Sequence, residues 1–238
     1  MPTGLVVSAH AADFVWRAGG AVALHAKRGY RMVVVCLSFG ERGESARLWR
    51  QPGATLDQVK SARRKEAERA AEILGAELIM FDLGDYPLRV ADEDLFRLAD
   101  IIRDLRPAFI LGHSAEDPYN YDHPLAKNFT HEARIIAQAH GHNPGAPVVA
   151  APPLFLFEPH QTEQCNWKPQ VFLNIDEVWD IKRRAFECMQ AQEFLWEYYT
   201  RVALQRGLQA TMNANSGITI THAEAYQRVF PAVVEELA

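Results

Sequence analysis

Two short clusters of histidine and aspartate, far apart in the chain, contain the residue types that bind a catalytic metal. His10 and Asp13 follow directly after the apolar segment Leu5–Ala9, and His123 lies in a second cluster that begins at Asn120. An imidazole and a carboxylate at the carboxyl end of a strand, joined by an imidazole from a distant loop, form a three-ligand catalytic zinc site. The sequence therefore predicts that these three residues hold one Zn²⁺ ion.

Each of these residues also has an ordinary structural role open to it. A lone histidine after a strand is often only a hydrogen-bonded structural residue, and an aspartate at a helix start is often the N-cap. His123 precedes Pro124, a residue typical of a helix start. Their combination in this order favours the metal site over three separate structural roles.

Apolar runs alternate with segments of helical periodicity over the first half of the chain. Strands rich in Val, Ile, Leu or Phe are expected at Leu5–Ser8, Met32–Leu37, Leu78–Asp82 and Phe109–Gly112. Helices are expected at Phe14–Lys27, Leu56–Leu74 and Asp92–Asp104, with Gly29 and Gly75 as stop signals. This order predicts an α/β fold: a Rossmann-like, doubly wound and mainly parallel sheet flanked by helices.

The pattern is looser in the second half. We expect a helix at Pro124–Ala139, strands at Leu154–Glu158 and, at a sheet edge, Val171–Ile175, and a helical stretch from Glu177 to about Gln209 that breaks near Phe194. A short apolar segment at Ile218–Thr221 and a terminal helix are expected to close the chain. Since the sequence has no internal repeat, low-complexity tract or clean domain boundary, one domain is expected over residues 1–238.

Ligands of such sheets bind beyond the carboxyl ends of the strands. Five polar segments are expected at that edge: His10–Asp13, Ser38–Arg50, Asp85–Arg89, His113–His123 and Glu158–Gln164. A polar residue after one strand could arise by chance, but five such segments at the same edge indicate a binding site.

Composition narrows the class of partner and the compartment. The net charge of −5 argues against nucleic acid or an anionic membrane as partner. Three widely spaced cysteines (Cys36, Cys165 and Cys188), without a CxxC motif, suit the reducing cytoplasm. Neither a signal peptide nor a bilayer-spanning run is visible. We therefore expect a cytoplasmic protein that acts on a small molecule.

Several motifs together resemble the PIG-L/LmbE-like family of zinc-dependent proteins. They are Ser8–Asp13, Gly19-Gly20, Gly43-Glu44, the Arg63–Gly75 helix motif, Asp122-His123 and Ala223–Ala225. The resemblance extends over nearly the whole chain. It implies a Rossmann-like fold and zinc held by His10, Asp13 and His123, with water completing the coordination shell.

The departures from this family concern proton transfer. The family's deacetylases have Ala-His-Pro-Asp-Asp-Glu at the first motif, where the first Asp is the general base; this chain has Ala12 there. Asn120 stands where the deacetylases have a histidine. Amide hydrolysis needs a base to activate water and an acid to expel the amine. Ala12 and Asn120 therefore argue against a deacetylase.

Longer segments resemble the zinc-dependent 4-oxalomesaconate hydratases within the same family. They are Phe14–Gly20, Cys36–Ser45, Asp117–Pro124, Phe157–Gln161 and Leu195–Arg201. This resemblance implies addition of water to the double bond of 4-oxalomesaconate, giving 4-carboxy-4-hydroxy-2-oxoadipate in gallate and protocatechuate meta-cleavage catabolism. It also implies Glu44 and His160 as the acid–base pair, without deciding which is the acid.

A substrate with three carboxylates needs local positive charge, for which arginine is better suited than lysine. Arg42, in the same loop as Glu44, is the first choice, and Arg17, Arg47 and Arg201 are weaker ones. Tyr119 and Asn120 are also expected at the substrate, while His113 and Asp122 are expected to orient the metal ligands. Aromatic-rich C-terminal helices suggest a homo-oligomer.

Three other functions compete with this interpretation. One is an N-deacetylase of an amino sugar or related amide, which would release acetate. Another is a nucleotide-binding Rossmann module without catalysis, against which no GxGxxG motif opens the first helix. The last is a metal-binding scaffold without turnover. Metal analysis and turnover assays separate them.

Overall fold

A seven-stranded sheet forms the centre of the molecule, with the strand order β3-β2-β1-β4-β5-β7-β6. The structure is a computed structural model that describes residues 1–215 and 217–234. The strands are β1 (Thr3–Ser8), β2 (Arg31–Cys36), β3 (Ala76–Met80), β4 (Phe109–Gly112), β5 (Leu154–Phe157), β6 (Val171–Asn174) and β7 (Ala223–Arg228). β1 to β5 are parallel, and β7 runs antiparallel to β5 and β6. The predicted mainly parallel α/β sheet is confirmed.

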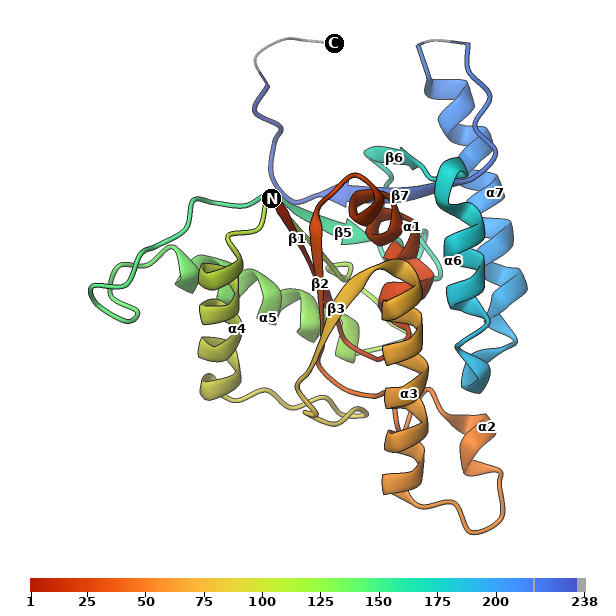
Figure 1. Ribbon diagram of the computed structural model, residues 1–238, viewed down its shortest axis with the longest axis horizontal. Coiled ribbons are helices and arrows are strands. Elements are labelled where there is room, and N and C mark those ends of the chain that lie inside the picture. Colours follow the sequence, from red (N-terminus) through yellow and green to blue (C-terminus); the bar gives the residue numbers. More distant parts are fainter. Residues whose placement is uncertain (216, 235–238) are drawn as a thin grey trace.

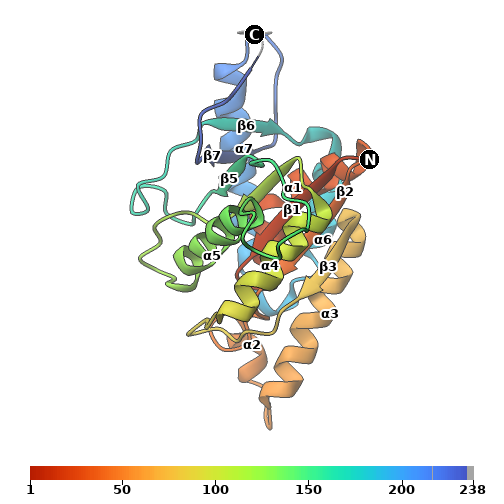
Figure 2. The same cartoon turned by 90° about the vertical axis from the view of Figure 1, so that its left-hand side faces the viewer.

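Helices cover both faces of this sheet (Figure 1). They are α1 (Asp13–Lys27), α2 (Ala46–Trp49), α3 (Leu56–Leu74), α4 (Asp92–Leu105), α5 (Asp122–Ala137), α6 (Trp179–Phe186) and α7 (Leu195–Asn213), with 3₁₀ turns at Asp176–Val178 and Gln190–Gln192. α4 and α5 lie together on one face, and Figure 2 looks onto that side. α1, α3 and α6 pack on the other face, and α7 packs against β7 and β6 beside α6.

The hydrophobic core is divided by the sheet into two parts. Leu5 and Val7 of β1 join the cluster under α4 and α5, while Val6 joins the cluster under α1 and α3. All three side chains are fully buried. Since neighbouring strand residues point to opposite faces, a strand buried on both faces has a continuous apolar run. This explains why the N-terminal strands are visible in the sequence.

The long helix α3, between β2 and β3, begins and ends as its sequence predicts. Thr55 caps α3 in a reciprocal capping box with Gln58. Gly75 ends the helix with φ 77°, a left-handed conformation that glycine adopts without strain.

The helical stretch in the second half is divided as expected. Between Glu177 and Gln209 the chain forms α6 and α7 with a turn between them, where Ala191 N–H donates to Glu66 of α3 and Gln192 accepts from Arg63. The break near Phe194 is confirmed, since α7 begins at the next residue.

The expected terminal helix is wrong within the described residues. Ala223–Arg228 instead forms β7 between β5 and β6, and Ile218–Thr221 precedes it without regular structure. Pairing with two distant strands decides the conformation of this segment, which local pattern does not reveal. Residues 235–238, on which that helix would also fall, lie outside the described part. No described helix combines the length and apolarity needed to cross a membrane.

Candidate active site

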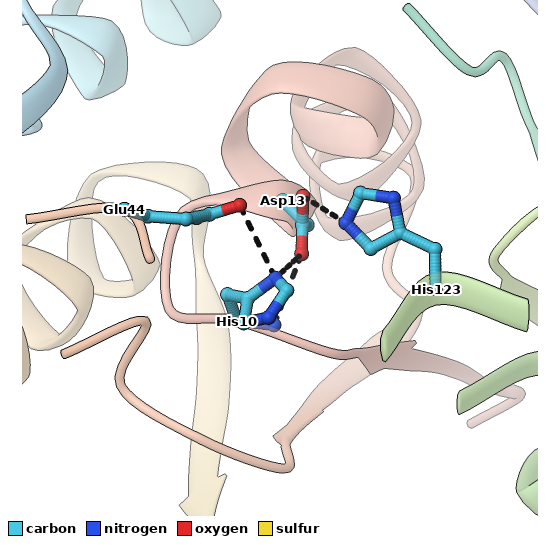
Figure 3. A group of neighbouring side chains, drawn as sticks. All are labelled: His10, Asp13, Glu44 and His123. Carbon is cyan, nitrogen blue, oxygen red and sulfur yellow. Dashed lines mark hydrogen bonds and ion pairs between the residues drawn. The ribbon is translucent and has the colours of Figure 1, made fainter. Parts of the chain in front are cut away.

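Four side chains from three parts of the chain meet beyond the carboxyl end of β1. His10, Asp13, Glu44 and His123 each offer one nitrogen or oxygen, and these atoms all lie within 4.8 Å of one another. Glu44 and His123 approach Asp13 from opposite sides (Figure 3). The structure therefore brings the three predicted metal ligands together and adds Glu44 to them.

A tight turn between β1 and α1 places His10 and Asp13. Ser8 Oγ donates to the His10 carbonyl at 2.6 Å and accepts from Phe14 N–H at 3.2 Å. Asp13 Oδ2 accepts from the backbone N–H of His10 at 3.0 Å, which closes the turn. The N-cap role that its position alone suggested is wrong: Asp13 is the first residue of α1, and Ala12 is the N-cap.

The loop after β2 delivers Glu44 to the same place. Gly40 has φ 68°, and a Cβ there would lie 3.2 Å from Glu44 and 3.3 Å from His10. Glycine is required here both by the left-handed backbone and by this close approach. Ser45 Oγ donates to the Gly40 carbonyl at 2.7 Å, and Asp85 accepts from the backbone N–H groups of Arg42 and Gly43.

His123 lies in the first turn of α5, after the loop that follows β4. Its Nδ1 lies 2.8 Å from Asp117 Oδ2, and its Nε2 is 3.6 Å from Asp13 Oδ1. Asn120 Oδ1 accepts from the backbone N–H of Asp122 at 3.1 Å, so its side chain shapes this turn. The loop thus aims the His123 Nε2 atom at the cluster.

Both histidines divide their ring nitrogens in the way that metal ligands do. His10 Nδ1 faces Asp13 and Glu44, at 3.1 and 3.2 Å, while its Nε2 lies 3.2 Å from Asp122. His123 Nε2 is buried and has no hydrogen-bond partner among the described residues, while Asp117 holds its Nδ1. One nitrogen toward the metal and the other on a carboxylate is the usual arrangement of zinc-bound histidine. Two imidazoles with carboxylate oxygens suit Zn²⁺.

The electrostatics of the cluster favour a bound cation. Burial alone would lower the pKa of His10, but Glu44 and hydrogen bonds to Asp122, Asp13 and Glu44 raise that pKa well above its usual value. Burial would likewise raise the pKa of Glu44, yet the neighbouring His10 lowers it, which keeps the carboxyl group ionised. The carboxylates around His10 therefore favour a positive charge at this place, and either a metal ion or a proton can supply it.

His160 lies on the loop after β5, held by two consecutive tyrosines of α7. The Tyr199 hydroxyl is 2.8 Å from His160 Nε2, and the Tyr198 hydroxyl donates to the His160 carbonyl. The residue retains solvent exposure, but its ring packs against both phenols. Desolvation, with the positive charge of Arg17, lowers the pKa of His160 to about 4. The contacts of the His160 side chain among the described residues are with Tyr198 and Tyr199, and none of them joins it directly to the cluster.

Arg17 is a buried cation next to the cluster, in the second turn of α1. Its Nε donates to Asp13 at 3.3 Å and its Nη1 to the Glu158 carbonyl at 2.7 Å. Its Nη2 is buried without a hydrogen-bond partner in the described part of the chain. A cavity of about 20 Å³, the size of one water molecule, borders Arg17 and Tyr199.

The residues expected to bind substrate lie in different settings. Arg42 is exposed and donates from its Nη1 to the Asp85 carbonyl at 3.2 Å, and exposed Tyr119 donates to Gln161 at 2.9 Å. Arg201 is 77% exposed and pairs with Glu197 of its own helix. No contact in the described chain links Arg201 to the cluster, and its role in binding stays a prediction.

The supporting residues were only partly visible in the sequence. His113 accepts from Ala9 N–H at 2.9 Å and stacks on His123 with ring centroids 4.3 Å apart, while Asp122 contacts His10. These two were expected to orient ligands. The contacts of Asp117 with His123 and of Tyr199 with His160 were not foreseen, because no motif spacing distinguishes them from other loop acids and helix aromatics.

Comparison with known proteins places this geometry in a family. Residues 5–134 match the PIG-L family, described as GlcNAc-PI de-N-acetylase. The chain is 62% identical to the 4-oxalmesaconate hydratase of Pseudomonas putida KT2440, over 99% of this chain and 92% of that protein. It is 28% identical to the diacetylchitobiose deacetylase of Thermococcus kodakarensis, over 85% of this chain and 77% of that one.

A solved structure agrees with the first of these matches. The crystal structure of GalB, the 4-carboxy-2-hydroxymuconate hydratase from Pseudomonas putida KT2440, superposes with a TM-score of 0.98 at 62% identity, and each chain is covered completely. The family match spans more than half of the chain, and the identity to the hydratases extends along all of it. The chain therefore belongs to the PIG-L family.

Proposed function

We propose that this chain is a zinc-dependent hydro-lyase that adds water to the double bond of 4-oxalomesaconate, giving 4-carboxy-4-hydroxy-2-oxoadipate. The observation that carries the proposal is the 62% identity to a protein named 4-oxalmesaconate hydratase, over 99% of this chain. The deacetylase relatives are far more distant, at 28% and 26% identity.

Ala12 separates the two chemistries within the site. It is fully buried in the turn between His10 and Asp13, at the motif position where the family's deacetylases have their general base. A methyl group accepts no proton, so this chain has no carboxylate at that place. The hydratase interpretation needs none there, since Glu44 is present.

His10, Asp13 and His123 would hold the zinc ion. When bound, zinc supplies Lewis-acid chemistry that makes water a stronger nucleophile and stabilises developing negative charge. The unpaired His123 Nε2 and the carboxylates around His10 support this assignment.

Glu44 is the proposed general base. Its carboxylate is ionised beside His10, and its Oε2 is buried with no hydrogen-bond partner within the described structure. That oxygen is free to take a proton from the water that adds to the substrate. The product name places the new hydroxyl on the carboxylate-bearing carbon, so the electron pair of the double bond moves to the neighbouring alkene carbon, where the adjacent carboxylate stabilises it. A proton added to that carbon, equivalent to the one that Glu44 takes from water, completes the addition.

His160 is the proposed partner of Glu44. With its pKa lowered to about 4, its ring is neutral near pH 7. A neutral imidazole N–H can donate a hydrogen bond to an oxygen that becomes negative during the reaction. We therefore assign His160 to the carboxylate oxygen that gains negative charge during the addition, and Glu44 to the water.

The carboxylates of the substrate require cations. The Nη2 of Arg17 is buried and has no hydrogen-bond partner in the part of the chain that is described. A carboxylate oxygen of the substrate would accept a hydrogen bond from it. Arg42 is the proposed second cation, at the exposed side of the Glu44 loop. We also propose that the substrate is a small polycarboxylate and that the protein takes part in gallate and protocatechuate catabolism. A cytoplasmic location is proposed as well, and the three unpaired thiols support it.

The test follows the ultraviolet absorbance of 4-oxalomesaconate. The native protein should consume it, the chelator-stripped protein should not, and added Zn²⁺ should restore the rate. Glu44→Gln should lower kcat by about 10²–10⁴-fold, with the native circular dichroism spectrum. Full activity after complete chelation would end the zinc mechanism.

A matched variant controls for the loss of any glutamate. Glu177→Gln removes a carboxylate from an exposed ion pair with Lys27, far from the cluster, and should leave the rate unchanged. Acetate release from an N-acetylated amino sugar, with no consumption of 4-oxalomesaconate, would instead establish the deacetylase.

A further inference from the structure

We infer that Tyr199 is a positioning residue that fixes the tautomer of His160, keeping the ring proton on Nδ1 and leaving that N–H for the substrate. The inference rests on the proposed role of His160. It assigns a role at the site to a residue of α7 that is not part of the metal cluster.

The carrying contact joins the Tyr199 hydroxyl to His160 Nε2 at 2.8 Å. It is the only hydrogen bond of that hydroxyl among the described residues, and His160 Nδ1 has none to the protein there. The two ring nitrogens are therefore in different situations: one is engaged by a phenol, and the other is free.

We assign the phenol as the donor in this pair. Tyr199 is 5% exposed, and its ring stacks on Trp16 with centroids 5.3 Å apart and an interplanar angle of 5°. Burial raises the pKa of its hydroxyl, which stays protonated. A buried hydroxyl proton without an acceptor costs free energy, and His160 Nε2 is the acceptor that this structure offers. Nε2 must then carry no proton.

A neutral imidazole that accepts at Nε2 carries its proton on Nδ1. Protonation of both nitrogens would turn Nε2 into a donor and leave the Tyr199 proton without its acceptor. The Arg17 charge also opposes a second proton on the ring, while Glu44 and Asp13 favour one and His123 opposes it. The Tyr199 contact thus selects one of the two neutral tautomers of the His160 ring. The surrounding charges affect only whether the ring is neutral or protonated.

Neighbouring Tyr198 holds a different atom of the same residue. Its hydroxyl donates to the His160 carbonyl, and its ring meets that of Tyr199 edge-on, with centroids 5.1 Å apart. Tyr198 therefore fixes the loop, and Tyr199 fixes the ring. This division provides a control that removes the same oxygen from the adjacent residue.

The direct test is long-range ¹H–¹⁵N NMR of the histidine rings in the full-length protein. The His160 signals are identified by their loss in His160→Gln. Wild type should show a protonated Nδ1 and a pyridine-type Nε2 at pH 7. Tyr199→Phe should give a mixture of tautomers, while Tyr198→Phe should keep the wild-type pattern.

A second readout uses the pH dependence of hydration. Because the phenol stabilises the neutral ring, its removal should raise the pKa of His160 and move the matching limb of the kcat profile to higher pH. Tyr199→Phe should also lower kcat by at least about tenfold, as loss of a residue that orients a histidine does. A purely structural role would lower the amount of folded protein without moving the limb.

Two results would overturn the inference. One is a wild-type His160 that is protonated on Nε2, and the other is a Tyr199→Phe protein with the wild-type tautomer and pH profile. The NMR result does not depend on turnover. If the protein failed to hydrate 4-oxalomesaconate, the proposed function would fail while the tautomer assignment could still be measured.

Discussion

Asp117 has no proposed role in proton transfer, yet it orients a proposed metal ligand. Its carboxylate lies 2.8 Å from His123 Nδ1, which turns the opposite ring nitrogen toward Asp13. Asp117→Asn should weaken zinc binding by about 10–100-fold, because the amide neither orients the ring as firmly nor raises its basicity. Competition with a chromophoric chelator measures this change in Kd.

The chain contains a matched histidine–aspartate pair outside the site. His142 Nε2 lies 2.8 Å from Asp100, the same distance as in the Asp117 pair. Asp100→Asn should leave the zinc Kd unchanged. Equal affinities in wild type and Asp117→Asn would show that His123 needs no such support.

His160 should also contribute to the pH dependence of stability. A free histidine has a pKa of about 6.5, and in the folded protein the pKa of His160 is lowered to about 4. Between these values the unfolded chain binds more protons, so the contribution is present above pH ~6.5 and is lost as pH falls toward 4. Urea unfolding of wild type and His160→Gln over this range should show a difference that shrinks on acidification; a constant difference would contradict the lowered pKa.

The site was predictable from the sequence where backbone and motif order determine it. His10 and Asp13 share one turn, and His123 follows a strand that pairs with β1, so parallel topology alone brings them near each other. Glu44 was foreseen as an acid–base residue, but not that it would lie 3.2 Å from His10. The Tyr199 contact depends on how α7 packs after a distant loop, which residue types do not specify.

At the scale of elements, Glu224 of β7 joins three segments. Its carboxylate accepts from the backbone N–H groups of Gly20 and Ala21 in α1, at 2.6 and 2.7 Å, and from Lys182 of α6 at 2.6 Å. Tyr226 donates to it as well. A Cβ at Gly20 would lie 2.7 Å from Ile175 and 2.9 Å from the carboxylate, so only glycine permits this approach.

Glu224→Gln should therefore destabilise the fold more than an ordinary surface change does. Lys182 and Glu224 are almost completely buried, and removal of one charge leaves the other without compensation. We expect a loss of about 3–5 kcal/mol in the free energy of unfolding, measured by urea titration. Glu177→Gln, at an exposed pair, should cost less than about 1 kcal/mol. Similar values for both variants would show that this joint contributes little.

The elements that the sequence could predict are those whose conformation is determined by local pattern, whereas β7 depends on contacts with distant segments. β1 and β2 have continuous apolar runs, and α3 has its cap and its terminal glycine, so local pattern was sufficient. β7 alternates small, charged and aromatic residues, and its strand conformation comes from pairing with β5 and β6. The turn between α6 and α7 likewise depends on contacts with α3.

For the whole molecule, strand order determines where the site can form. The order β3-β2-β1-β4-β5 places β1 beside β4, where connections leave in opposite directions. The loops after β1, β2, β4 and β5 then converge at one end of the sheet. They supply, respectively, the His10–Asp13 turn, Glu44, His123 at the start of α5, and His160.

The outer helix bears on oligomeric state. α7 forms the outermost layer in Figure 1, and Leu204, Leu208 and Met212 recur along it at four-residue spacing. They are 43%, 63% and 78% exposed, so one face of the helix presents apolar side chains to solvent. Burial of each such side chain against a second copy of the chain would gain about 1.5–3 kcal/mol. We predict a homo-oligomer in which this face is covered.

Light scattering after size-exclusion chromatography measures the outcome. Wild type should elute above the 26.8 kDa of one chain, and Leu208→Glu combined with Met212→Glu should shift it toward that mass, because burial of two carboxylates opposes association. Arg201→Glu, which changes charge on the same helix at an exposed ion pair, serves as the control and should not dissociate it. A monomeric wild type would show that solvent, not a second copy, covers this face, and the exposed leucines would then need a partner of another kind.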